Sequence, residues 1–256
     1  MLVEVIGTVH ETNHHQLHQK TVIVVDVLRA TSTIITALAH GCHTVIPATT
    51  VEEALQFKQS MNINNRECLL GGERCGQRIA GFDIGNSPLE YRTTDIAHRT
   101  IVMTTTNGTR AIQSASPAAH VLAGAFINSF ACAEVASALQ RDVVILCAGT
   151  DDAFSLEDGL CAGCIIEQLK VICGIPSIIL NDLGIAMQVS YQNCKPFLES
   201  YLLMSSNGKN LVALGSEADL TYCAQLNVIS TVPILTCQGM QHFNPSLIND
   251  ESIQEA

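Results

Sequence analysis

The segment VIVVDVLRATSTIITAL, residues 22–38, brings a carboxylate, a guanidinium and three hydroxyls together where an apolar run gives way to a helical pattern. Asp26 ends the apolar run, Arg29 follows, and Thr-Ser-Thr occupies positions 31–33. A carboxylate at the carboxyl end of a parallel strand faces the crevice in which open α/β sheets bind ligands. Hydroxyls and free N–H groups at a helix N-terminus bind anions, and arginine adds a cationic fork. The segment indicates an anion site, and the alternative is a strand end followed by an ordinary helix cap.

A second segment, LLGGERCGQRIAGFDIGNSPLEY at 69–91, holds five glycines, two arginines and the acidic residues Glu73 and Asp83. Glycine lets the backbone approach a ligand closely. Arg74 and Arg78 are suited to anion contacts, whereas Glu73 and Asp83 offer oxygen ligands for a hard cation such as Mg²⁺. Long ordered loops are usually functional, so we interpret this segment as part of a site. A surface loop with a turn at GNSP is the alternative.

A third segment, TIVMTTTNGTRAI at 100–112, repeats the layout of the first: a strand end, hydroxyls, a turn and a helix start that carries an arginine. Asn-Gly is a strong turn signal. The alternative is a capped hairpin or βα turn. Two copies of an unusual layout favour the interpretation as a site.

A fourth, weaker cluster lies in CAGTDDAFSLEDGLCAG at 147–163, after another strand-like run. Its carboxylates at Asp151, Asp152, Glu157 and Asp158 are candidates to complete a metal site. An equally good explanation is a capped helix start whose acidic residues are solvated.

The elements that must position these residues alternate along the chain. Strand-like runs rich in β-branched residues occur at 2–9, 21–28, 43–49, 67–72, 100–106, 120–126, 142–149 and 227–235. Helical periods occur around 31–40, 51–60, 109–115, 129–140, 157–172, 179–191, 195–204 and 216–225. This alternation predicts an α/β fold of mostly parallel sheets flanked by helices.

The distribution of charge suggests two lobes. Residues 1–141 hold ten basic and eleven acidic side chains, a net of −1, whereas residues 142–256 hold three and thirteen, a net of −10. We predict an N-terminal α/β lobe over 1–120, which carries the anion-binding motifs, and a helix-rich C-terminal α/β lobe over 121–256, with the site between them. One compact domain is the alternative.

Composition excludes several classes of partner. A net charge of −11 argues against binding to nucleic acid or to an anionic membrane. No apolar run reaches the roughly 18 residues of a transmembrane helix, and the start has no signal-peptide pattern. Eleven cysteines without a regular framework are typical of reduced thiols in a cytoplasmic protein.

Taken together, DVLRATSTIITAL, LGGERCGQRIAGFDIGNSPLEY and TTTNGTRAI closely resemble the 2-phosphosulfolactate phosphatase family, and the resemblance runs over most of the chain. It implies a Mg²⁺-dependent hydrolase that removes phosphate from (2R)-O-phospho-3-sulfolactate, a step on a route to coenzyme M. It also implies that the following residues surround the pocket: Asp26, Arg29, Thr31, Ser32, Glu73, Arg74, Asp83, Asn86, Asn107, Thr109 and Arg110.

We therefore predict a Mg²⁺-dependent phosphatase for a small polyanionic phosphate ester. The predicted catalytic residues are Asp26, Arg29, Glu73 and Arg74. The predicted substrate-binding residues are Thr31, Ser32, Arg78, Asn86, Thr106, Asn107, Gly108, Thr109 and Arg110. The predicted Mg²⁺ ligands are Asp26 and one or more of Glu73, Asp83, Glu157 and Asp158.

Four points stay open at this stage. Asp26 is either a metal ligand or the nucleophile. The substrate is phosphosulfolactate or another small phospho-hydroxy acid, such as phosphoglycolate or phospholactate. A non-catalytic protein that binds an anionic metabolite is the alternative from another class. The oligomeric state is open, with a homodimer among the candidates.

Overall fold

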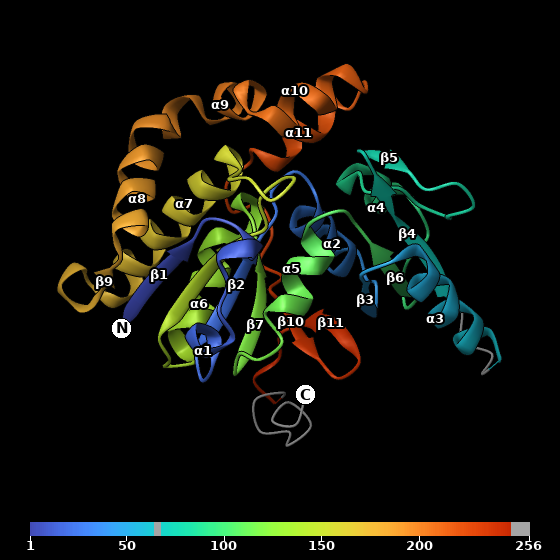
Figure 1. Ribbon diagram of the computed structural model, residues 1–256, viewed down its shortest axis with the longest axis horizontal. Helices are drawn as coiled ribbons and strands as arrows, with labels where there is room; N and C mark the ends of the chain where they lie inside the picture. Colours follow the sequence, from blue (N-terminus) through green and yellow to red (C-terminus); the bar gives the residue numbers. More distant parts are fainter. Residues whose placement is uncertain (64–67, 247–256) are drawn as a thin grey trace.

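The computed structural model describes residues 1–63 and 68–246, and in this part of the chain one eleven-stranded sheet runs through the molecule (Figure 1). Its strands are β1 (Leu2–Ile6), β2 (Thr21–Val25), β3 (Thr44–Ala48), β4 (Cys68–Arg74), β5 (Gln77–Arg78), β6 (Thr100–Thr104), β7 (His120–Gly124), β8 (Val143–Cys147), β9 (Ile179–Leu180), β10 (Pro233–Thr236) and β11 (Gly239–His242). The strand order is β5-β4-β6-β3-β11-β10-β7-β2-β8-β1-β9.

Helices cover the sheet and its upper end. They are α1 (His14–Leu17), α2 (Ala30–Ala39), α3 (Val51–Ile63), α4 (Pro88–Thr93), α5 (Gly108–Ser114), α6 (Ser129–Ala138), α7 (Leu156–Cys173), α8 (Asp182–Cys194), α9 (Leu198–Met204), α10 (Ser206–Ala213) and α11 (Glu217–Cys223). None of the described helices is long and apolar enough to cross a membrane.

The sheet consists of two parallel groups joined by an antiparallel hairpin. One group is β4-β6-β3 and the other is β7-β2-β8-β1-β9. The β10–β11 hairpin lies between them, where Ile234 pairs with Leu122 and Met240 pairs with Val45. The predicted α/β fold with mostly parallel strands is confirmed. The division at residue 120 stays a prediction.

The central strands are buried on both faces, which explains their unbroken apolar runs. In β2, Ile23 and Val25 belong to the hydrophobic core with α6 and α7, whereas Val22 and Val24 belong to the core on the opposite face. Successive side chains of a strand point to opposite faces, so a strand covered on both sides needs apolar residues throughout.

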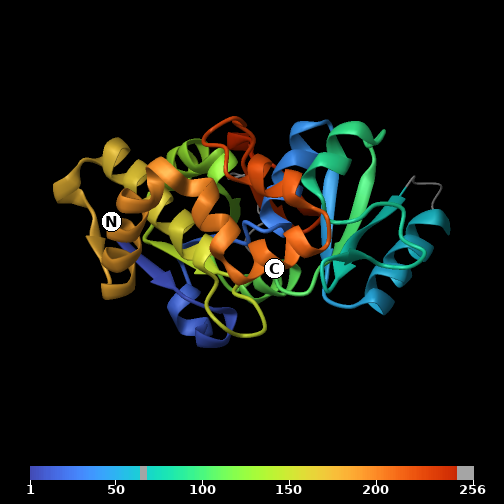
Figure 2. The same ribbon diagram turned by 90° about the horizontal axis from the view of Figure 1, so that it is seen from above.

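The C-terminal helices form an arc over the sheet. From the β9 edge, α8, α9 and α10 lead across to a position above the carboxyl ends of the strands (Figure 1), and from above they cross the middle of the molecule (Figure 2). Crevices outside the carboxyl ends of parallel strands are where α/β proteins bind ligands. The C-terminal helices therefore cover the place where a site is expected.

Two sequence predictions need correction. The strand predicted over 227–235 is shorter and begins at Pro233. Helix α10 was not predicted, because SNGKNLVA contains a glycine and two asparagines, which are poor helix formers. The helix is nevertheless stabilised by an N-cap and by packing: the Ser205 hydroxyl accepts a hydrogen bond from the Gly208 N–H at 3.0 Å, and Leu211 is buried. Residue 67, at the start of the strand predicted over 67–72, lies outside the described residues.

Candidate active site

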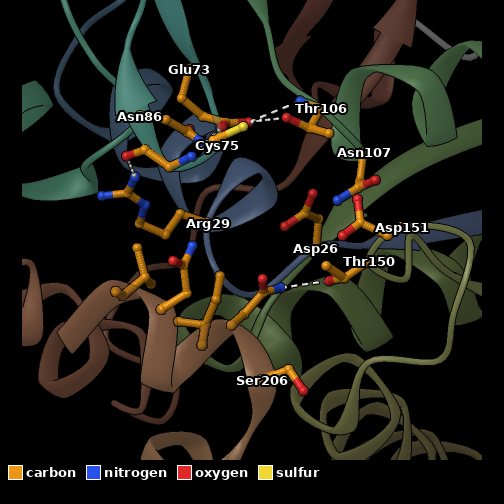
Figure 3. A pocket seen from close by; sticks show the side chains of 15 residues that line it. Asp26, Arg29, Glu73, Cys75, Asn86, Thr106, Asn107, Thr150, Asp151 and Ser206 are labelled. Carbon is orange, nitrogen blue, oxygen red and sulfur yellow. Dashed lines mark hydrogen bonds between the residues drawn. The ribbon is translucent and has the colours of Figure 1, made fainter. Parts of the chain in front are cut away.

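A cavity of about 360 Å³ opens at the carboxyl ends of β2, β4, β6 and β8, and residues of α10 form part of its wall. Figure 3 shows the side chains that line it. The cavity takes residues from both parallel groups of strands and from the C-terminal helices. The lining residues are Asp26, Leu28, Arg29, Glu73, Cys75, Gly76, Asn86, Thr106, Asn107, Thr150, Asp151, Ser206, Asn207, Asn210 and Leu211.

Asp26 is a nearly buried carboxylate at the end of β2, with an exposed fraction of 9%. Its Oδ1 accepts a hydrogen bond from the Ala30 N–H, in the first turn of α2, at 3.2 Å. Burial, followed by repulsion from Glu73 and Glu157, raises the pKa of Asp26 to about 7, although the Ala30 N–H and Arg29 oppose the shift. Near neutral pH the Asp26 side chain is therefore present in both its protonated and its ionised form.

Gly108 lies against Asp26. A Cβ at position 108 would lie 2.6 Å from Asp26 Oδ2 and would also overlap the Ala30 side chain. Glycine is thus the residue that lets α5 begin directly beside the carboxylate. The sequence predicted a substrate-binding role for Gly108; the structure puts it behind Asp26 and not among the cavity-lining residues.

Glu73 is held by both of its carboxylate oxygens. Its Oε1 accepts hydrogen bonds from the N–H and the hydroxyl of Thr106 at 2.8 and 3.0 Å, and its Oε2 accepts one from the Gly76 N–H at 2.8 Å. These contacts tie the end of β4 to the turn after β6. They also fix the orientation of the carboxylate, which is 7% exposed and lines the cavity.

Arg29 reaches the cavity in a fixed orientation. Its Nη1 forms an ion pair with Asp219 Oδ2 at 2.7 Å, and its Nη2 donates to the Gly76 carbonyl at 2.7 Å. The other oxygen of Asp219 accepts a hydrogen bond from the Ser87 hydroxyl at 2.6 Å. The sequence interpretation missed Asp219; an acidic residue within the predicted helix 216–225 carried no sign of this contact.

Hydroxyls near the starts of α2 and α5 form hydrogen bonds with backbone carbonyls of the loops that precede these helices. The Thr31 hydroxyl donates to the Asp26 carbonyl at 2.9 Å, and the Ser32 hydroxyl donates to the Val27 carbonyl at 2.9 Å. The Thr109 hydroxyl donates to the Thr105 carbonyl at 3.1 Å. Thr31, Ser32 and Thr109 are fully buried and do not line the cavity, so they brace the loops that carry Asp26 and Asn107.

Three of the four predicted arginines lie elsewhere. Arg74 donates to the carbonyl of Glu73 at 2.8 Å, and Arg78 is an exposed residue of β5. Arg110 pairs with Asp152 at 2.5 Å and borders a separate cavity. The structure does not bring Arg74, Arg78 or Arg110 to the lining of the cavity that holds Arg29 and Asp26.

Glu157 and Asp158 lie in the first turn of α7, 1% and 2% exposed, behind the cavity lining. Glu157 Oε1 accepts a hydrogen bond from Asn207 at 2.9 Å. The oxygens of Asp158 accept from the N–H groups of Val27 and Gly149 at 2.9 and 3.2 Å. Burial, then repulsion from Asp26 and Glu157, raises the pKa of Asp158 well above its usual range.

Asp83 does not join the other acidic residues. Its Oδ2 pairs with Lys58 at 2.6 Å and accepts a hydrogen bond from the Leu70 N–H at 2.8 Å. It is exposed and does not line the cavity. These contacts explain why an acid in the glycine-rich segment lies apart from Asp26 and Glu73.

Two further observations concern a metal. Within residues 1–63 and 68–246, no three His, Cys, Asp or Glu side chains are close enough together to hold a metal ion. Asn86, which is 5% exposed and lines the cavity, has a buried Oδ1 atom without a hydrogen-bond partner among the described residues.

Several lining residues were missed by the sequence interpretation. They are Thr150, in the loop after β8, and the residues of α10, among them the asparagines Asn207 and Asn210, whereas Asp151, in the same loop as Thr150, was among the candidate acidic residues. The poor helix formers of SNGKNLVA were the available signal, because local sequences that conflict with their structure tend to mark functional sites.

Comparisons with known proteins place the chain in a family. The sequence model of the 2-phosphosulpholactate phosphatase family matches residues 6–238. A relative from Symbiobacterium thermophilum is 43% identical over 223 residues, covering 86% of this chain and 93% of the relative. Relatives from Clostridium tetani and Thermotoga maritima are 39% and 41% identical, covering 91% and 84% of this chain and 97% and 89% of theirs. All three are named probable 2-phosphosulfolactate phosphatases. The chain therefore belongs to the 2-phosphosulfolactate phosphatase family.

Proposed function

We propose that the protein is a Mg²⁺-dependent phosphatase that hydrolyses (2R)-O-phospho-3-sulfolactate to 3-sulfolactate and phosphate. The observation that carries the proposal is the carboxylate of Asp26, buried at the carboxyl end of β2 and facing a cavity lined by oxygen and amide groups. The names of the relatives, probable 2-phosphosulfolactate phosphatases, support the choice of substrate.

The charge of the cavity supports a requirement for a cation. Asp26, Glu73 and Asp151 line it, and the cationic lining residue Arg29 is already neutralised by Asp219. A polyanionic ester would be repelled by such a cavity unless a cation bound with it. Mg²⁺, when bound, would offset the charge on the phosphate oxygens.

The donor groups fit Mg²⁺. The cavity lining offers hard oxygen donors: the carboxylates of Asp26 and Glu73, and the Oδ1 of Asn86, which has no hydrogen-bond partner within residues 1–63 and 68–246. Mg²⁺ commonly takes one or two carboxylates and completes its shell with water and substrate phosphate. A site of this kind needs no cage of three protein carboxylates. Of the predicted ligands, Asp26 and Glu73 are the best placed.

The chain's own residues divide the remaining work. Asp26 acts either as a ligand or as the nucleophile towards phosphorus, and both roles need its ionised form, which becomes more abundant as the pH rises through about 7. Arg29 is held rigidly enough to orient an anionic group. Thr106 and Asn107 line the same cavity and supply polar contacts beside Asp26 (Figure 3).

Two alternatives differ in their consequences. A phosphatase for phosphoglycolate or phospholactate would use the same carboxylates but would gain nothing from a sulfonate. A protein that merely binds an anionic metabolite gains nothing from buried carboxylates beside its binding site. The acidic lining of the cavity therefore favours catalysis over simple binding.

The test is phosphate release by the purified protein, with phosphosulfolactate, phosphoglycolate and phospholactate compared side by side. We expect turnover of phosphosulfolactate with MgCl₂, loss of turnover when a chelator is added, and slower turnover of the two esters that lack a sulfonate. Turnover that survives complete chelation would contradict the metal requirement. Binding of phosphosulfolactate without phosphate release would favour the non-catalytic alternative.

We further propose that the reaction serves coenzyme M biosynthesis in the cytoplasm. The substrate named in the relatives supports the pathway, and the eleven free cysteines, most of them buried, support a reducing compartment. A homodimer stays a prediction.

A further inference from the structure

The two sides of the cavity differ in chemistry. Figure 3 shows Arg29 and Asn86 on one side, and Asp26, Asn107 and Asp151 on the other. The side with Asp26 is acidic and suits a phosphate that binds together with a cation. The side with Arg29 holds a guanidinium and the amide of Asn86, which suit an oxyanion that binds directly. The carboxylate of Glu73 lies between the two sides, where its oxygens accept hydrogen bonds from Gly76 and from Thr106.

We propose that the Arg29 side of the cavity is a subsite for the sulfonate of the substrate, and that Asn210 of α10 is the residue that gives this subsite its specificity. The inference rests on the proposed function, because it assumes that the phosphate occupies the side with Asp26. It adds a recognition residue from a helix that none of the sequence motifs contains.

Arg29 alone gives this subsite too little charge. Its Nη1 and Nη2 groups are engaged by Asp219 and by the Gly76 carbonyl at 2.7 Å each. A guanidinium has five N–H donors, so the others remain for a ligand in the cavity. Because Asp219 neutralises the charge, further N–H donors are needed to hold an oxyanion there.

Asn210 is placed to supply such a donor. Its Nδ2 atom lies 3.5 Å from the position that a Cβ on Gly76 would take. The Asn210 amide therefore lies beside Gly76, whose carbonyl accepts a hydrogen bond from Arg29. Asn207 already donates to Thr150 and Glu157 at 2.7 and 2.9 Å. The Asn210 amide has no such partner among the described residues and lines the cavity.

Helix α10 carries a net positive charge, as expected for a helix that lies beside a bound anion. The second half of the chain has a net charge of −10, yet SNGKNLVA contains no acidic residue and carries the cation Lys209. Two asparagines and a glycine in an eight-residue helix lower its intrinsic stability. Residues that weaken a helix and face a cavity are best explained by what they bind.

The test compares wild-type protein with the Asn210→Ala variant on phosphosulfolactate and on phospholactate, which keeps the phosphate and the carboxylate but lacks the sulfonate. Losing one hydrogen bond to a charged group should lower kcat/KM for phosphosulfolactate about tenfold, mainly through KM. The value for phospholactate should change less than about twofold. Alanine favours helix, so loss of α10 would not explain the effect.

The matched control is Asn193→Ala, which removes an exposed asparagine of α8 whose amide donates to the Val189 carbonyl at 2.7 Å. It should leave the values for both esters unchanged. An equal fall on both esters for Asn210→Ala, or no fall on either, would overturn the subsite.

Calorimetric binding of 3-sulfolactate separates this inference from the proposed function, since binding needs no turnover. If wild-type protein binds 3-sulfolactate and Asn210→Ala binds it about tenfold more weakly, the contribution of Asn210 to binding the sulfonated ligand holds even where the phosphatase assay fails. Equal affinity of the two proteins would refute the role of Asn210 whatever the assay gives.

Discussion

Arg29 and Asp219 form a buried ion pair between the loop after β2 and helix α11, with side chains 5% and 3% exposed. The 190 positions that separate them explain why neither motif analysis nor helix periodicity linked the two. Through this pair the C-terminal helices are attached directly to the cavity, and the guanidinium of Arg29 is held in one orientation.

Removing Asp219 should destabilise the protein strongly. Asp219→Ala leaves the guanidinium of Arg29 buried without its counter-ion, a change that typically costs about 3–5 kcal/mol. Urea unfolding of the variant measures the loss. Asp95→Ala is the control, because it breaks the exposed pair between Asp95 and Arg99 and should cost less than about 1 kcal/mol. Equal losses in the two variants would contradict the role given to the buried pair.

Gly108→Ala should disturb the active site and the fold together. The added methyl group would overlap Ala30 and approach Asp26 Oδ2 to 2.6 Å, and overpacking of this kind typically costs about 1–3 kcal/mol. We expect a lower unfolding midpoint and slower phosphate release.

Gly7→Ala is the matched control for this change, since a Cβ at Gly7 would meet its nearest neighbour, Glu11, at an ordinary 3.4 Å. A Gly108→Ala protein with the stability and activity of wild type would show that α5 can move away from Asp26 freely.

The sequence predicted most of the segments that carry the site. It did not predict which side chains of those segments face the cavity. An unbroken apolar run that ends in Asp26 fixes a buried strand with a carboxylate at its carboxyl end, and the structure has this arrangement. The place of Glu73 at the site was predictable for the same reason, because this residue lies near the carboxyl end of its strand. By contrast, Thr31 and Thr109 bond their own loops, since a buried hydroxyl needs a partner wherever one is nearest.

Ion pairs with residues distant in the sequence account for most of the other differences between the predicted and the observed site. Asp83 pairs with Lys58, and Arg110 pairs with Asp152, so both side chains are turned away from the cavity. Such pairings depend on which loops meet in three dimensions, and a single sequence carries no signal for them. Helix α10 was missed for a local reason, its poor helix formers, which the fold overrides by burying Leu211.

The metal-free protein should lose stability as the pH rises towards and through 7. The pKa of Asp26 is raised to about 7 from 3.8, so between these values the native state keeps a proton that the unfolded chain has released. The unfolded state then binds fewer protons, and the free energy of unfolding falls with increasing pH. Thermal unfolding at pH 5, 6, 7 and 8 in the presence of a chelator measures this trend.

Asp26→Asn should make that pH dependence less steep, because an amide does not titrate, while Asp158, whose pKa is also raised, keeps its own contribution. The variant should also melt at a higher temperature than wild type at pH 8, since it removes one of several mutually repelling carboxylates. An identical slope in both proteins would mean that Asp26 is not the group responsible.

Mg²⁺ should stabilise the protein through Asp26 and Glu73. A ligand that binds the native state raises the free energy of unfolding, by about 2.7 kcal/mol at one hundred times its Kd. We expect MgCl₂ to raise the melting temperature of wild type, and Glu73→Gln to abolish most of that rise. Asp83→Asn should respond like wild type, because Asp83 pairs with Lys58 away from the cavity. A Mg²⁺ response lost in Asp83→Asn and kept in Glu73→Gln would reverse this assignment.

The most direct test of the account is the rate of phosphate release from phosphosulfolactate by Asp26→Asn with saturating Mg²⁺, beside wild type and the surface variant Asp95→Asn. Because Asp26 is assigned the role of ligand or nucleophile, its loss should lower kcat by at least about 100-fold, while Asp95→Asn should stay within about twofold of wild type. Turnover by Asp26→Asn near the wild-type rate would contradict the central claim that this carboxylate carries the reaction.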